Sequence, residues 1–194
     1  MRPVTLALLL LAVSASIALA GDKPPREYLD DRTGASITVV SEPLVFAAAR
    51  PDLAANVRDY VTLAAAAVDR SGRLSYVLIA YYWSTVDPRL RREPMLAPEP
   101  LLLQADDRRM RLASDGQSAR EAGIGMAVHE PAGSDVSPHT YPTDLAALRY
   151  ICKARRLSIV SDTHAEPLGA FELWQDGRPA LCEFVRHVSG GASP

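Results

Sequence analysis

Three alternating side chains in the C-terminal part of the chain have the chemistry of metal ligands. Asp162, His164 and Glu166 follow a predicted strand, and in extended backbone all three would point to the same side. Carboxylate and imidazole groups bind hard and borderline metal ions, so the segment suggests a metal-binding protein or a metal-dependent hydrolase. The spacing matches no distinct metal-ligand signature, and we favour the alternative interpretation, a solvated polar turn.

The sequence contains none of the motifs that mark several common enzyme classes. A G-x-S-x-G nucleophile elbow, an H-E-x-x-H zinc motif, a P-loop and an EF-hand loop are absent. Gly123-Ile124-Gly125 resembles the start of a dinucleotide-binding fingerprint, but Val128 occupies the position of the third glycine. We therefore assign no catalytic residue and expect no cofactor. The sequence favours a nonenzymatic interaction or structural module.

Two arginine groups and one aromatic run could bind a ligand. The arginines could face a phosphate or an acidic polymer, although such runs are more often solvated loop and strand faces. Tyr81, Tyr82 and Trp83 could stack against a sugar or a peptide. Neighbouring residues of a strand point to opposite faces, however, which favours core packing. The arginine groups are Arg89, Arg91 and Arg92 and, further along the chain, Arg108, Arg109 and Arg111.

Residues 1–20 have the pattern of a signal peptide. Arg2 supplies a positive charge, residues 6–13 are apolar without interruption, and Ala18-Leu19-Ala20 before Gly21 fits signal-peptidase cleavage. This pattern predicts a periplasmic or secreted protein. The alternative is an N-terminal membrane anchor, because the uncharged stretch 3–21 is close to the roughly 20 residues that span a bilayer.

Charge and composition restrict the class of partner. The chain carries a formal charge of −2 and is 48% hydrophobic, and loss of Arg2 with the leader would change the charge to −3. The lack of a basic excess argues against a general nucleic-acid binder, and the hydrophobic content argues against intrinsic disorder. No apolar run after the leader is long enough to cross a membrane. The candidate partners are therefore an envelope protein or an envelope polymer.

The mature chain is predicted to form a polar spacer at residues 21–34 and a single globular α+β domain at residues 35–190. Residues 74–86 are apolar on both strand faces, which places them at the centre of a mainly antiparallel sheet. Residues 58–68 favour the other arm of a long hairpin, although residues 52–68 also fit a helical stripe. Shorter strands are predicted at residues 36–40 and 44–49, as a tight pair, at 101–105 and 109–113, as a hairpin, and at 123–129.

A helix, two strands and a second helix are predicted to follow a loop at residues 130–142. Thr143 can cap the first helix, and Asp176 and Pro179 can open the second. Cys152 and Cys182, the two cysteines of the chain, lie one on each predicted helix. Export leads to an oxidising compartment, so we predict a disulfide that joins the two helices. Two separate buried thiols are the alternative.

Segments at both ends of the mature chain carry a family resemblance. They are YLDDRTGA at 28–35, EPLVFA at 42–47, DYVTL at 59–63, YWSTVD at 82–87 and LWQDGRPAL at 173–181. These segments resemble those of a group of small exported proteobacterial proteins to which no activity is assigned. The resemblance implies export and a single domain and carries over no catalytic residue. The two cysteines depart from the pattern of that group.

Signal-peptide cleavage can be tested directly on the exported protein. Because the charged, apolar and small-residue regions are all present, the mature chain should begin at Gly21 and appear in the soluble periplasmic or secreted fraction. Mass spectrometry of the purified chain measures the start residue. A chain that keeps Met1 and partitions with membranes would instead show that the leader is an anchor.

Overall fold

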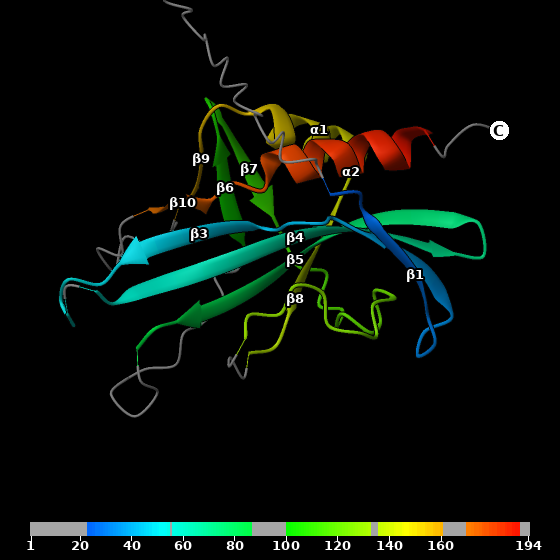
Figure 1. The fold of residues 1–194 in the computed structure, drawn as a ribbon, viewed down its shortest axis with the longest axis horizontal. Helices are drawn as coiled ribbons and strands as arrows, with labels where there is room; N and C mark the ends of the chain where they lie inside the picture. Colours follow the sequence, from blue (N-terminus) through cyan, green and yellow to red (C-terminus); the bar gives the residue numbers. More distant parts are fainter. Residues whose placement is uncertain (1–22, 55, 87–99, 133–135, 161–169, 191–194) are drawn as a thin grey trace, which may run out of the picture.

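A computed structural model describes residues 23–54, 56–86, 100–132, 136–160 and 170–190, and it confirms an α+β fold (Figure 1). The strands of these ranges form one ten-stranded sheet in which every pairing is antiparallel. The elements are β1 (Arg26–Asp30), β2 (Ala35–Val39), β3 (Leu44–Ala49), β4 (Arg58–Arg70), β5 (Arg73–Ser84), β6 (Leu101–Ala105), β7 (Arg108–Leu112), β8 (His139–Thr143), α1 (Leu145–Lys153), β9 (Leu157–Val160), β10 (Phe171–Gln175) and α2 (Arg178–Gly190).

The long hairpin of β4 and β5 is the centre of the sheet. The strands pair from Asp59 with Ser84 to Arg70 with Arg73, and Ser71-Gly72 closes the turn with positive φ at both residues. Such a two-residue turn matches the twist of the strands that it joins. The strand prediction for residues 58–68 is confirmed over the helical alternative. β5 also pairs with β8, so its predicted interior position is confirmed.

Residues 36–40 and 44–49 form strands, but the prediction that they pair with each other is wrong. β2 pairs with the C-terminal half of β4, and β3 pairs with its N-terminal half, so the two strands follow one another along the same edge. β4 is 13 residues long and can accept both partners. The break between them contains Pro43, which has no N–H group to donate to a ladder.

Four other predictions are corrected, three at the margins of the sheet and one at the start of α1. The predicted spacer at 21–34 contains β1, a short edge strand whose exposed side chains hide its pairing with β2. Residues 123–129 form turns and bends instead of a strand, and the predicted loop 130–142 contains most of β8. Helix α1 is capped by Asp144 rather than Thr143, because the Asp144 carboxylate accepts the Ala147 N–H at 2.7 Å.

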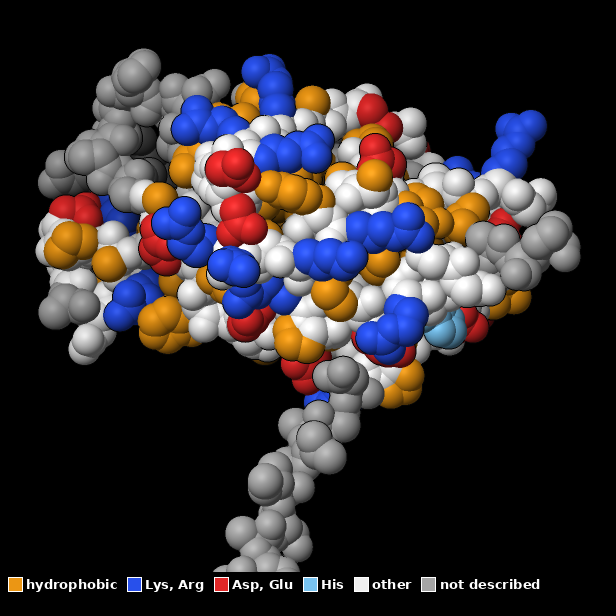
Figure 2. Space-filling model, turned by 90° about the horizontal axis from the view of Figure 1, so that it is seen from above, with side chains coloured by type: hydrophobic (Ala, Val, Ile, Leu, Met, Phe, Trp, Pro, Cys, Tyr) orange, Lys and Arg blue, Asp and Glu red, His pale blue; other side chains and the backbone are white. Residues whose placement is uncertain are grey.

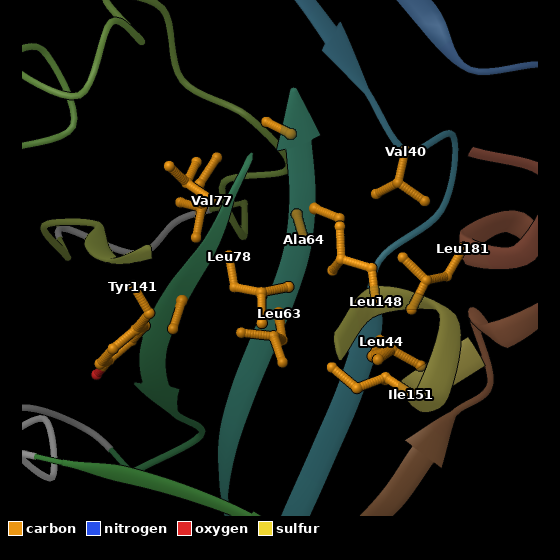
Figure 3. Close-up of a cluster of buried hydrophobic side chains, with 14 of the residues drawn as sticks. Val40, Leu44, Leu63, Ala64, Val77, Leu78, Tyr141, Leu148, Ile151 and Leu181 are labelled. Atoms are coloured by element: carbon orange, nitrogen blue, oxygen red, sulfur yellow. The ribbon is translucent and has the colours of Figure 1, made fainter. Parts of the chain in front are cut away.

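Helices α1 and α2 cover one face of the sheet and pack against each other. Leu148 and Ile151 of α1 and Leu181 of α2 point toward a layer of strand side chains (Figure 3). Within the described ranges, no helix is long and apolar enough to cross a membrane. The strand residues in that layer include Leu44 of β3, Leu63 of β4 and Leu78 of β5.

The opposite face of the sheet is partly covered by the segment 113–132. Asp30, at the end of β1, is fully buried and fastens this segment to the sheet. Its carboxylate accepts the N–H groups of Gly125 at 2.6 Å, Met126 at 3.0 Å and Arg32 at 2.9 Å. Burial raises the pKa of Asp30, but backbone hydrogen bonds, with Gly125 the strongest, outweigh it and hold the pKa below its usual value.

The two helices are joined by a disulfide between Cys152 and Cys182, whose Cα atoms are 5.1 Å apart. The sequence separation of 30 residues closes a loop that contains β9 and β10. Arg178, in the first turn of α2, adds a polar link because its guanidinium donates to the carbonyl of Arg155 at 2.8 Å. The helix pair is therefore held covalently, by apolar packing and by a charged side chain.

Removal of this disulfide should lower stability without changing the fold. In the chain-entropy account, closing a loop of this length contributes about 3.5 kcal/mol to the free energy of unfolding. The double variant Cys152→Ala/Cys182→Ala should lose an amount of that order in urea denaturation. Reductant should lower the stability of the wild type toward that of the double variant and leave the variant unchanged. Two titratable thiols in the denatured, unreduced protein would contradict the bridge.

Asp30→Asn should destabilise the protein by about 2 kcal/mol, because backbone N–H groups would lose a charged acceptor. The lowered folded-state pKa means that Asp30 stabilises the fold above its unfolded pKa of about 4, and that this contribution disappears as the pH falls through the folded pKa. Urea denaturation between pH 7 and pH 2 should show less acid dependence in Asp30→Asn than in the exposed control Asp31→Asn. Equal acid dependence in the two variants would contradict this role.

Candidate functional site

An aromatic cluster lies on the sheet face opposite the helices. Tyr60 of β4 and Trp83 of β5 are directly paired, and their rings stack with centroids 4.2 Å apart and planes 9° apart. Trp174 of β10 meets Tyr60 edge-on, with centroids 6.3 Å apart. We call these three rings together with Arg58 the aromatic surface. Both tryptophans of the chain belong to it.

The rings of Tyr60 and Trp83 are held in place by apolar contacts with β3 and by a hydrogen bond to Thr62. Val45 and Ala47 of β3 pack under them in a small apolar cluster that is separate from the main core. The indole N–H of Trp83 donates to the hydroxyl oxygen of Thr62 at 3.0 Å, and Thr62 is buried. A stacked pair with a satisfied polar atom has little freedom to reorient.

Trp174 is exposed because β10 contains a β-bulge. Leu173 pairs with Phe46 and Gln175 pairs with Val45, so Trp174 is the extra residue between two pairings. Bulges redirect a side chain away from the regular alternation of a strand. Trp174 is 59% exposed, and the guanidinium of Arg58 lies 4.7 Å from the centroid of its ring. This large apolar side chain is thus held at the surface by backbone geometry and a cation–π contact.

A row of polar side chains continues from the aromatic surface across the sheet. Residues directly opposite each other in a ladder point to the same face. Tyr60 is directly paired with Ala47 on β3. On the next four strands, the residues paired in succession from Ala47 are Glu172, Ser158, Gln104 and Arg109. We call the last four residues the polar row. Glu172 and Arg109 are exposed, and Ser158 and Gln104 are half-buried.

The middle of the polar row lines an open pocket of about 510 Å³. Arg155 and Arg156, in the turn between α1 and β9, stand at its side together with Asp106. The Asp106 carboxylate accepts the backbone N–H groups of Arg156 and Arg155, both at 2.9 Å, and these bonds lower its pKa. Neither of the two guanidinium groups has a hydrogen bond or ion pair with any residue in the described part of the chain.

Helix α1 and the turn that follows it, which brings Arg155 and Arg156 to the pocket, are basic, whereas the pocket lining also contains Asp106 and Glu172. Residues 145–156 contain four basic residues and no acidic one. Figure 2 views the molecule from above, the side on which the helices lie in Figure 1, and shows Lys and Arg side chains interspersed with Asp and Glu side chains. The basic residues of this stretch are Arg149, Lys153, Arg155 and Arg156.

The candidate metal ligands Asp162, His164 and Glu166 lie outside the described residues, as do Arg89, Arg91 and Arg92. Elsewhere in the described ranges, no group of three or more His, Cys, Asp or Glu side chains could hold a metal ion. Gly123 and Gly125 lie in the segment that Asp30 fastens, and the Gly125 N–H binds that internal carboxylate. The metal hypothesis stays a prediction from the sequence.

The aromatic run was interpreted correctly at two of its three positions. Tyr81 and Tyr82 are buried on opposite faces, at 1% and 3% exposure, which confirms core packing. Trp83 instead joins the aromatic surface, and the sequence interpretation missed its partners Tyr60 and Trp174. The available signal was the hairpin register, which places Tyr60 opposite Trp83 once the turn at Ser71-Gly72 is known.

The three arginines of β7 have different surroundings. Arg108 lies over the ring of Tyr150, with its guanidinium carbon 5.2 Å from the centroid. Arg109 points to the other face as the last member of the polar row, and Arg111 is exposed. Only Arg109 is therefore placed where it could act together with the pocket.

Comparisons of the chain with protein-family models, with curated proteins and with solved structures each found no match. Function is therefore inferred from the geometry of this chain alone.

Proposed function

We propose that the protein is an exported, nonenzymatic binding module of the periplasm or cell envelope and that the aromatic surface is its binding site. The observation that carries this proposal is Trp174, which is 59% exposed beside Tyr60 and Trp83. Tryptophan and tyrosine supply large contact area with few rotatable bonds, and they dominate the energetics of many binding surfaces. The bulge holds a large apolar ring in water, and a ligand that covers this ring would remove its apolar surface from water.

The chemistry of the surface supports binding rather than catalysis. Indole rings, a phenol and a guanidinium do not exchange protons near neutral pH. They offer stacking area, hydrogen-bond donors and one fixed positive charge. This set of groups recognises a ligand and does not by itself supply a nucleophile or a general base.

Three observations support the extracytoplasmic location. The leader pattern at residues 1–20 directs export, and the cysteine pair at disulfide distance suits an oxidising compartment. The resemblance to exported proteobacterial proteins supports the same location. We propose that the leader is cleaved and that the mature chain is periplasmic or secreted, with a retained N-terminal anchor as the alternative.

Tryptophan fluorescence can report ligand binding at the aromatic surface. Because both tryptophans lie in the aromatic surface, a ligand that covers it should shift the emission of the mature protein to shorter wavelength. Polysaccharide and protein fractions of a periplasmic extract are the probes, titrated separately. One fraction should bind saturably, and Trp174→Ala should weaken this binding about 10-fold, the effect of losing roughly 1.4 kcal/mol of contact.

Leu29→Ala is the matched control, because Leu29 is 62% exposed on β1 and lies outside the aromatic surface. Its apparent affinity, measured by an added fluorophore as well as by emission, should equal that of the wild type. The proposal fails if neither fraction changes the emission or if Trp174→Ala and Leu29→Ala bind equally well.

A further inference from the structure

We infer that the ligand of this site is an acidic polysaccharide that lies across the strands, from the aromatic surface over the polar row to the arginines of the pocket. This inference rests on the proposed function and specifies its ligand. The path starts at Trp83 on β5 and ends at Arg109 on β7. Six strand spacings separate the two, which corresponds to roughly 29 Å at about 4.8 Å per spacing. A path of this length suits several units of a polymer.

A ligand on the polar row can bind to side chains, because the backbone groups of the strands between its ends are already hydrogen-bonded. β3, β10, β9 and β6 each pair with a strand on both sides, so their N–H and C=O groups are used in ladders. An extended peptide gains affinity by adding its main chain to an open sheet edge. In the described part of the chain, open edges occur along this path at its two ends, at β7 and at residues 81–84 of β5. A peptide strand added at either edge would run along one strand, whereas a ligand that crosses the row meets side chains and no open ladder.

The side chains of the row match the two surfaces of a sugar ring. The C–H groups on one face of the ring carry partial positive charge, which the electron-rich faces of Trp83 and Trp174 attract. The ring hydroxyls both donate and accept hydrogen bonds, and Glu172, Ser158 and Gln104 can pair with them. Gln104 is already oriented, because its amide N–H₂ donates to the carbonyl of Asp106 at 2.9 Å, and no residue in the described ranges donates to its amide oxygen.

The charges indicate that the sugar chain is acidic. Four guanidinium groups, those of Arg58, Arg109, Arg155 and Arg156, line the path against two carboxylates, Asp106 and Glu172. Among the described residues of the path, the formal charge is thus 4 − 2 = +2, whereas that of the whole chain is −2. The pocket lining itself is balanced, and the excess comes from Arg58 and Arg109 at the two ends of the path. Asp106 accepts the backbone N–H groups of Arg155 and Arg156 and also interacts electrostatically with their side chains.

The distribution of these charges disfavours a nucleic acid. Each nucleotide carries a phosphate, so a bound single strand needs positive charge along its whole length. Here Glu172 occupies the middle of the path, and three of the four arginines gather at one end. A polymer with acidic groups on some of its units and apolar ring faces fits this pattern better.

Binding to defined polymers tests the inference on the mature, disulfide-bonded protein. The probes are oligomers of alginate, which carry carboxylates, oligomers of chondroitin sulfate, which also carry sulfates, a neutral glucan of equal length and a single-stranded oligonucleotide. At least one acidic glycan should bind saturably with a shift in tryptophan emission, and at least 10-fold more tightly than either the neutral glucan or the oligonucleotide. Calorimetry supplies an independent affinity.

Variants distinguish the two parts of the path. Arg155→Gln/Arg156→Gln should weaken the acidic glycan at least 10-fold and leave binding of the neutral glucan unchanged, whereas Trp174→Ala should weaken both. Arg26→Gln/Arg73→Gln, which removes the same charge at exposed positions on β1 and β5 away from the pocket, should bind as the wild type does.

The inference is wrong if neither acidic glycan binds, if the oligonucleotide binds as tightly, or if the remote double variant loses as much affinity as the pocket variant. In those cases the extract titration still decides the proposed function separately. Saturable binding of the protein fraction that depends on Trp174 would keep the aromatic surface as the binding site and assign it a protein partner instead.

Discussion

The pairing of β4 with β5 determines the positions of both the core and the candidate site. Successive residues of β4 point to opposite faces, so Val61 and Leu63 face the helices while Tyr60 and Thr62 face away from them. A shift of one residue in this register would send the aromatic side chains into the helix layer and the aliphatic ones into solvent. The same hydrogen bonds therefore stabilise the hydrophobic core and hold Tyr60 against Trp83.

The two faces of the sheet are covered by different means, and this leaves room for a site. The helix pair covers one face with a continuous apolar layer that the disulfide holds together. On the other face, the segment 113–132 has no helix or strand of its own over most of its length, and it depends on the buried carboxylate of Asp30. The aromatic surface lies on this second face, where Val45 and Ala47 form only a small separate cluster.

Local sequence patterns predicted the elements whose partners are close in the chain. The hairpin of β4 and β5 is fixed by a two-residue turn, and the inward residues of α2, such as Phe184, follow a helical stripe. Where the partner is distant, the patterns predicted strands such as β2 and β3 but not their pairing. The placement of β2 and β3 end to end depends on the length of β4, and β8 was hidden because it pairs with β5 across some sixty residues. Trp174 could not be placed because its exposure results from a bulge against a strand over a hundred residues away.

The site combines rigid rings with a group of guanidinium side chains, and the positions of both follow from bonds made for structural reasons. Trp83 is fixed by Thr62 and by stacking on Tyr60, so a ligand that covers these rings would freeze few additional rotamers. Asp106 directs its carboxylate to the backbone of the turn after α1, which positions that turn and the side chains of Arg155 and Arg156 at the pocket. The hydrogen bonds of Asp106 and the pairing of β4 with β5 thus position two different groups on one row of side chains. Aromatic rings for stacking lie at one end of this row, and arginines that attract anions lie at the other.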